Sequence, residues 1–195
     1  MEQLPMFPLG TVLLPHMPLS LRIFEERYVV MLSRVLQDDV SEFGVVLIER
    51  GQEVGGGEHR FDVGTVARIV QLEAGEGFIA LVAEGERRIR VDSWLDDDPH
   101  PRADVTELDE LVWDDDLLLD LVAAEDLVRA TLEKLGDDTR WPADVDLTDE
   151  PVARAWQLAG IAPLGQIDQL ELLRSTTMAE LLAGIVTKTE AVVFP

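Results

Sequence analysis

Residues 6–28 read MFPLGTVLLPHMPLSLRIFEERY, and this stretch decides the fold class of the 195-residue chain. Prolines interrupt its apolar runs. Because proline has no amide donor, we expect the runs to form edge strands and kinked connections rather than the centre of a regular sheet. The period changes after Phe24, where apolar side chains at helical spacing predict a helix over residues 25–36.

Short strands are predicted downstream of this helix. The runs 43–50, 63–72, 78–82 and 87–94 are rich in β-branched or aromatic residues and are separated by glycine-containing breaks. Two glycines in residues 73–77 favour a hairpin turn, since glycine tolerates the positive φ angles that such turns need. Several short strands at this spacing indicate a barrel or a sandwich.

The second half of the chain returns to a helical period, with an apolar stripe from Leu117 to Leu135 and Gly136 as a C-cap. The expected helices cover residues 114–135, 148–160, 166–174 and a segment that opens with the capping-box pattern at Thr177. The sequence therefore predicts an α+β chain with two parts, residues 1–112 and residues 113–195. The second part is a small helical bundle.

The charge and composition exclude several classes of partner. The net charge is −23, and residues 96–150 hold twenty acidic against four basic residues. Such a chain repels phosphate backbones and anionic lipid, so we expect no nucleic acid and no membrane partner. Cysteine is absent, no export signal is visible, and no apolar run reaches the roughly 18 residues of a membrane span. The expected location is the cytoplasm.

No motif for catalysis stands out. A phosphate-binding loop and a G-x-S-x-G elbow are both missing, and His16, His59 and His100 are isolated from one another. Carboxylates abound, but no pair is distinguished by its spacing. We expect no catalytic residue, no metal and no cofactor.

Three further segments have structural interpretations. Residues 96–100 are expected to form a solvated acidic turn around His100 rather than a weak site for a hard cation. Residues 55–57, three glycines, predict a flexible loop between strands. Arg87 and its neighbours Arg88 and Arg90 are expected to pair with nearby carboxylates rather than form a strip that binds nucleic acid.

Residues 6–28 resemble the opening of the Lon protease amino-terminal, or substrate-binding, domain family. Residues 63–69, 85–91 and 169–173 resemble later segments of that family, so the resemblance covers nearly the whole chain. It implies a PUA-like β pseudobarrel with one early helix, followed by a C-terminal helical bundle. The ATPase and Ser–Lys peptidase domains of Lon have no counterpart here, which implies a free-standing copy.

The resemblance implies a non-catalytic protein- or peptide-binding or adaptor module whose partner is a polypeptide, with weak homo-oligomerisation as a further expectation. Two alternatives stay open. One is a carboxylate- or divalent-ion-dependent hydrolase or small-ligand-binding protein, which requires a pocket with converging acids of perturbed pKa. The other is an RNA-binding PUA-like protein, against which the charge argues.

The candidate peptide-binding residues are Met6, Pro15, Met17 and Phe24, because methionine and other apolar side chains adapt to varied partners. Glu25 and Arg27 are expected to form a structural ion pair.

Overall fold

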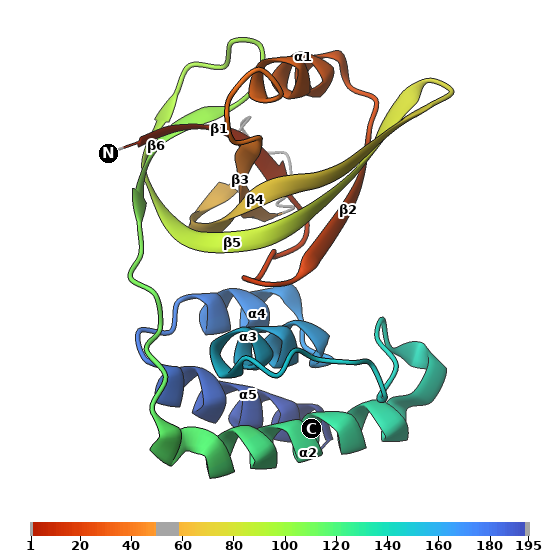
Figure 1. Ribbon diagram of the computed structural model, residues 1–195, viewed down its shortest axis with the longest axis vertical. Coiled ribbons are helices and arrows are strands. Elements are labelled where there is room, and N and C mark those ends of the chain that lie inside the picture. The colour runs from red at the N-terminus through yellow and green to blue at the C-terminus, as the bar shows by residue number, and fades with distance from the viewer. Residues whose placement is uncertain (1, 50–58, 194–195) are drawn as a thin grey trace. The chain divides into compact units, whose positions relative to one another are not determined.

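The computed structural model describes residues 2–49 and 59–193 (Figure 1). The chain divides into two compact units, residues 1–108 (unit 1) and residues 109–195 (unit 2). Every described strand belongs to unit 1 and most of the helices belong to unit 2, which confirms the α+β class. The predicted glycine loop at residues 55–57 lies outside the described residues. No described helix is both long and apolar enough to cross a bilayer.

The described part of unit 1 consists of a mixed sheet of six strands and one helix. The elements are β1 (Glu2–Leu9), β2 (Pro18–Ile23), α1 (Glu26–Val35), β3 (Glu42–Glu49), β4 (His59–Gly75), β5 (Phe78–Leu95) and β6 (Arg102–Glu107). The strand order is β2-β5-β4-β3-β1-β6, and β5 also pairs with β6. The strand pairings therefore form a closed series, in which each of β5, β4, β3, β1 and β6 pairs with the next and β6 pairs again with β5. Closure of these pairings does not by itself establish the PUA-like pseudobarrel, which stays a prediction.

Strand β1 lies between β3 and β6, so the expectation that its prolines belong to an edge is wrong. Residues 2–5 pair with β6, whereas residues 6–9 pair with β3 in the parallel sense. Each half of β1 thus has a partner on one side, and the missing amides of Pro5 and Pro8 can face the other side. Strand β2 does lie at an edge, and its proline is the first residue of the strand, where no ladder bond is lost.

Strand β5 is continuous, although the sequence indicated a break near Gly85. Glycine is needed there for a close approach rather than a turn, because a Cβ on Gly85 would lie 2.2 Å from the carbonyl oxygen of Leu14. The segment that follows Leu14 is also hydrogen-bonded to this residue, since His16 N donates to Gly85 O at 2.7 Å. The true turn between β4 and β5 contains Gly77, with φ at +79°, as predicted.

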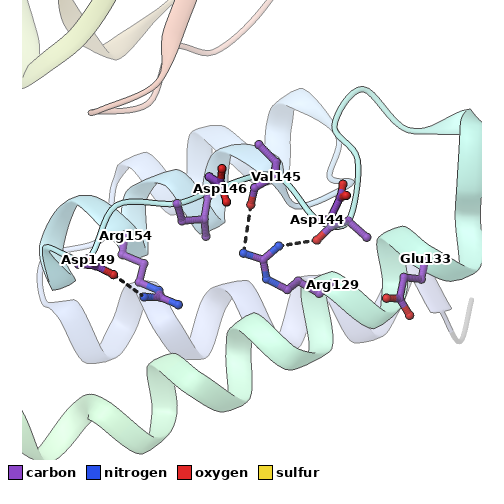
Figure 2. A pocket seen from close by; sticks show the side chains of 9 residues that line it. Arg129, Glu133, Asp144, Val145, Asp146, Asp149 and Arg154 are labelled. Atoms are coloured by element: carbon purple, nitrogen blue, oxygen red, sulfur yellow. Dashed lines mark hydrogen bonds and ion pairs between the residues drawn. The ribbon is translucent and has the colours of Figure 1, made fainter.

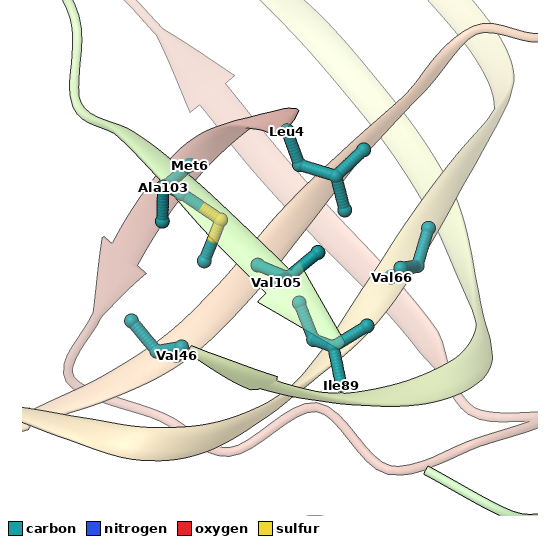
Figure 3. Packing of buried hydrophobic residues seen from close by; sticks show 7 residues of the cluster. All are labelled: Leu4, Met6, Val46, Val66, Ile89, Ala103 and Val105. Atoms are coloured by element: carbon teal, nitrogen blue, oxygen red, sulfur yellow. The ribbon is translucent and has the colours of Figure 1, made fainter. Parts of the chain in front are cut away.

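Buried apolar side chains from five strands fill the space that these pairings enclose (Figure 3). The cluster consists of Leu4, Met6, Val46, Val66, Ile89, Ala103 and Val105. Helix α1 packs through Tyr28, whose ring stacks on Phe7 with centroids 3.9 Å apart. Burial of this apolar surface is the main stabilising contribution to unit 1.

Arg87 on β5 forms ion pairs with carboxylates from three other strands. Its guanidinium donates two hydrogen bonds to Glu42 of β3, at 2.5 and 2.8 Å, and lies 3.3 Å from Glu2 of β1 and 3.4 Å from Glu107 of β6. The hydrogen bonds to Glu42 raise the pKa of Arg87. Arg90 pairs with Asp92 at 3.2 Å, so both arginines have the carboxylate partners that the sequence predicted.

Unit 2 is the expected small helical bundle. Its elements are two short 3-10 turns, η1 (Asp115–Leu117) and η2 (Gly136–Asp138), and the helices α2 (Leu118–Leu135), α3 (Pro151–Ile161), α4 (Gln166–Leu173) and α5 (Met178–Val193). Helix α5 lies against the other three helices (Figure 1). The helix starts follow from local chemistry: the Glu150 carboxylate accepts from Val152 N and Ala153 N, and Thr177 Oγ1 accepts from Glu180 N.

We predict that Arg87→Met lowers the free energy of unfolding by about 2 kcal/mol, because three carboxylates then face one another without a cation. Urea unfolding followed by circular dichroism measures the change. Arg90→Met is the matched control, because Arg90 is half exposed and its ion pair joins it to a residue two positions away; its loss should cost under about 0.5 kcal/mol. Equal losses in the two variants would contradict the central role of Arg87.

Candidate functional site

Three of the four candidate peptide-binding residues are buried. Met6 and Met17 are 0% and 8% exposed, and Pro15 is also buried, whereas Phe24 is 71% exposed. The four side chains therefore do not meet in one surface groove. Of the four, only Phe24 is presented to solvent and available to a partner without rearrangement of the core.

Met6 is buried because it fills the space above a glycine. A Cβ on Gly44 would lie 2.4 Å from Met6 Sδ, so the absence of a side chain on β3 makes room for the thioether. Methionine suits an irregular gap of this kind because its side chain is unbranched and flexible. The same adaptability that suggested partner binding is used here for packing.

Phe24 follows the last residue of β2 and belongs to a small aromatic and cationic surface. The pairing of β2 with β5 ends at Ile23 and Ile79, and Phe24 and Phe78 are the residues one position beyond this last pair. The guanidinium of Arg22 lies over the Phe78 ring, 5.1 Å from its centroid. We call Arg22, Phe24 and Phe78 the Phe24 surface.

Glu25 and Arg27 flank this surface and form the predicted ion pair, with Arg27 Nη2 3.0 Å from Glu25 Oε2. Arg27 also lies over the ring of Tyr28, 4.7 Å from its centroid. Both charged side chains are more than 40% exposed, so the pair contributes little to stability.

The edge of β2 carries backbone groups that face away from the sheet. In an antiparallel pair, alternate residues turn their N–H and C=O groups toward the partner strand. Gly85 N donates to Met17 O, which places residues 19, 21 and 23 toward β5 by the same alternation. Ser20 and Arg22 therefore direct their N–H and C=O groups to the open side, where β2 has no strand partner among the described residues.

Unit 2 contains an open pocket of about 680 Å³ between α2, α3 and the segment that joins them (Figure 2). Two arginines in its wall already have protein partners. Arg129 donates to the carbonyl oxygens of Ala143 and Val145 and lies 2.8 Å from a Glu125 oxygen, while Arg154 donates to the other Glu125 oxygen at 2.8 Å.

These contacts make the pocket a structural junction. Burial raises the pKa of Glu125, but the hydrogen bonds from Arg154 and Arg129 outweigh burial and leave its pKa below the usual value. Glu125 is therefore a carboxylate that holds two guanidinium groups in place. Asp144, Asp146 and Asp149 line the remaining wall, so the pocket repels anions.

The pKa values of the carboxyl groups of Asp92, Glu125 and Glu180 are all lowered. The Thr106 hydroxyl is the main cause for Asp92, and the backbone N–H of Thr176 is the main cause for Glu180. General acid catalysis at neutral pH requires a raised carboxyl pKa instead. Across residues 2–49 and 59–193, no cluster of three or more His, Asp or Glu side chains has the arrangement of a metal site.

His100 is 2% exposed, so the expectation of a solvated turn is wrong at this residue, although Asp96, Asp97 and Asp98 are exposed. Its Nδ1 lies 3.1 Å from Pro101 O and its Nε2 lies 3.5 Å from Arg34 Nη1. A neutral ring can donate to the carbonyl and accept from the guanidinium. Burial, together with Arg34 and Arg102, lowers the pKa of His100.

The sequence interpretation missed an exposed apolar region on α2. Leu118, Leu119 and Val122 are 55%, 80% and 49% exposed; Leu119 lies opposite the buried stripe of the helix, and Leu118 and Val122 lie between Leu119 and that stripe. The signal was present in the unbroken run Leu117-Leu118-Leu119, which places apolar side chains around the whole helix rather than along one stripe.

A family model for the ATP-dependent protease La (LON) substrate-binding domain matches residues 3–187. The chain belongs to this family. The match covers both units, in agreement with the resemblance that residues 6–28 indicated.

Lon proteases are similar to this chain along nearly its whole length. Lon protease of Brevibacillus choshinensis is 26% identical over 192 residues, which cover 95% of this chain and 24% of that protein. Lon protease of Escherichia coli strain K12 is 25% identical over 199 residues, which cover 97% of this chain and 25% of that protein. The chain thus spans about a quarter of the length of these curated relatives.

Solved structures of Lon amino-terminal domains share the fold. The Lon N-terminal domain protein from Xanthomonas campestris superposes with a TM-score of 0.69 and 26% identity, covering 96% of this chain and 98% of that one. The N-terminal domain of Lon protease from the Mycobacterium avium complex has a TM-score of 0.68 and 18% identity, covering 97% and 98% of the two chains.

We predict that the lowered pKa of His100 makes unit 1 less stable in mild acid. The unfolded chain binds the proton more readily than the folded chain, so stability is complete above the unfolded histidine pKa of about 6.5 and falls as the pH drops through the lower folded value. Proton NMR titration should show the His100 resonance, assigned by its absence in His100→Gln, titrating below 6.5. The loss of stability between neutral pH and pH ~5 should be smaller in His100→Gln, and an unchanged loss would contradict the assignment.

Proposed function

We propose that the chain is a non-catalytic module that binds extended polypeptide segments at the open edge of β2, beside the Phe24 surface. This proposal rests on the way in which successive residues of β2 alternate between facing β5 and facing the open side of the sheet. Its buried side chains, Leu19 and Ile23, hold it to the sheet, while the backbone groups of Ser20 and Arg22 point outward. An added strand would satisfy these groups by main-chain hydrogen bonds.

Strand addition suits a module that engages many polypeptides, because the backbone is common to all sequences. Side-chain selectivity would come from Phe24, which can bury its ring against an apolar residue of the partner, and from the positive charge of Arg22. The family supports the same class of function, since its description is that of a substrate-binding domain. The partner would be a polypeptide in the cytoplasm.

We also propose that the chain has no catalytic activity. The altered carboxyl pKa values are lowered, and the pocket arginines are already paired with Glu125 and with backbone carbonyls. These observations favour neither a carboxylate-dependent hydrolase nor an anion-binding site. Arg87 and Arg90 are engaged by carboxylates, which gives no support to RNA binding.

We predict that Ser20→Pro weakens binding of a permanently unfolded polypeptide about fivefold. Proline removes the outward N–H of residue 20 and spares the bonds from β2 to β5, and one such hydrogen bond is worth about 1 kcal/mol. Fluorescence anisotropy of a reduced, alkylated and labelled protein measures the dissociation constant.

Ser20→Ala is the matched control, because it removes the hydroxyl and keeps the N–H. Equal affinity of Ser20→Pro and Ser20→Ala would contradict strand addition at this edge. A wild-type chain that binds no unfolded polypeptide would contradict the proposed function itself.

The Phe24 surface has a separate test. Phe24→Ser should weaken binding of the same unfolded polypeptide about tenfold, because an exposed aromatic ring that becomes buried in the complex contributes more than about 1.4 kcal/mol. Val40→Ser, at an exposed valine beyond α1, should leave the affinity unchanged. Similar losses in both variants would mean that exposed apolar area in general, rather than Phe24, carries the binding.

A further inference from the structure

The first two turns of α2 carry an apolar surface that unit 2 does not use for its own core. Leu118 and Val122 are four residues apart and Leu119 and Val122 three apart, so their side chains adjoin on one side of the helix. Ala123, one turn after Leu119, is also exposed. We call Leu118, Leu119, Val122 and Ala123 the α2 patch.

The α2 patch is distinct from the apolar side of α2 that packs into the core of unit 2. The opposite side of α2 is already buried through Leu121, Ala124, Val128 and Leu132. Leu119 is 80% exposed and its neighbours Leu118 and Val122 are 55% and 49% exposed, so the exposed apolar side chains form a group rather than one isolated residue. A contiguous exposed apolar patch with a polar rim marks an interaction surface.

The rim of the α2 patch is acidic. Asp115, Asp116, Asp120 and Asp126 lie within one turn of it and are exposed. Asp115 accepts a hydrogen bond from Trp113 Nε1 at 3.0 Å. In the described part of the chain, none of these four carboxylates forms an ion pair with a lysine or arginine side chain, so their negative charge is not neutralised by the protein.

The negative charge of this rim indicates which kind of partner the α2 patch binds. We propose that the α2 patch binds a basic amphipathic polypeptide segment, one whose apolar side chains cover Leu118, Leu119 and Val122 while its lysines or arginines neutralise the acidic rim. A second copy of this chain would bring the same aspartates and another 23 net negative charges to the contact. Anionic lipid would be repelled for the same reason.

This site is independent of the proposed function. It lies in unit 2, uses side chains rather than open backbone groups, and selects by charge, whereas the β2 edge in unit 1 recognises the main chain. A chain with Ser20→Pro should therefore retain it.

The test uses a labelled amphipathic peptide of leucine and lysine and its counterpart with glutamate in place of lysine, in anisotropy titrations at low salt and at about 0.3 M salt. The lysine peptide should bind at low salt and bind more weakly at high salt, because exposed charges are screened. The glutamate peptide should not bind. Equal binding of the two peptides, or no binding of the lysine peptide at low salt, would overturn the proposal.

Variants separate the α2 patch from the overall charge of the protein. Leu119→Ser should weaken binding of the lysine peptide about tenfold, whereas Ile167→Ser, at a leucine-sized exposed residue of α4, should not. Replacing Asp120 and Asp126 by asparagine should weaken binding and flatten its salt dependence more than the same change at Asp137 and Asp138. If Leu119→Ser and Ile167→Ser had equal effects, or the two double aspartate changes had equal effects, the peptide would be binding to the acidic protein in general rather than to the α2 patch. Unchanged circular dichroism of each variant establishes that the fold is retained.

Discussion

One edge of the long strand β5 pairs with two different strands, β2 and β6, and the arrangement of unit 1 follows from this division. Residues 79–84 pair with β2 and residues 89–95 pair with β6, while β4 occupies the other side. At the junction, Gly85 admits the carbonyl of Leu14, and Arg87 draws Glu2, Glu42 and Glu107 together. The pairing with β6 closes the order of the strands. The pairing with β2 leaves that strand with one unpaired edge.

The helices could be predicted well from the sequence because their signals are local. Caps at Glu150 and Thr177, the glycine at position 136 and the buried spacing from Leu121 to Leu132 all lie within a few residues of the boundaries they set. The strand order could not be predicted in this way. The prolines of β1 indicated an edge, and only the division of its pairing between β6 and β3 explains why an internal position accepts them.

The candidate site shows the same limit. An apolar side chain has no local signal that tells whether it faces the core or the solvent, and Met6 is buried because a glycine 38 positions away, Gly44, leaves room for it. Phe24 is exposed because β2 ends immediately before it. His100 lies in an acidic segment and is buried because Arg34 and the carbonyl of Pro101 give its ring polar partners. The ion pair of Glu25 and Arg27 was predictable because its partners are two residues apart.

The junction in unit 2 has a consequence for how the bundle is connected. The segment between η2 and α3 has no regular backbone ladder, and its carbonyls at Ala143 and Val145 are held by the side chain of Arg129 on α2. Arg129 and Arg154 in turn share the single carboxylate of Glu125. Arg129 thus holds the connection against α2, and the Glu125 carboxylate joins Arg129 to Arg154 of α3. The course of that connection is therefore set in part by two side chains of α2, a helix that ends before the connection begins.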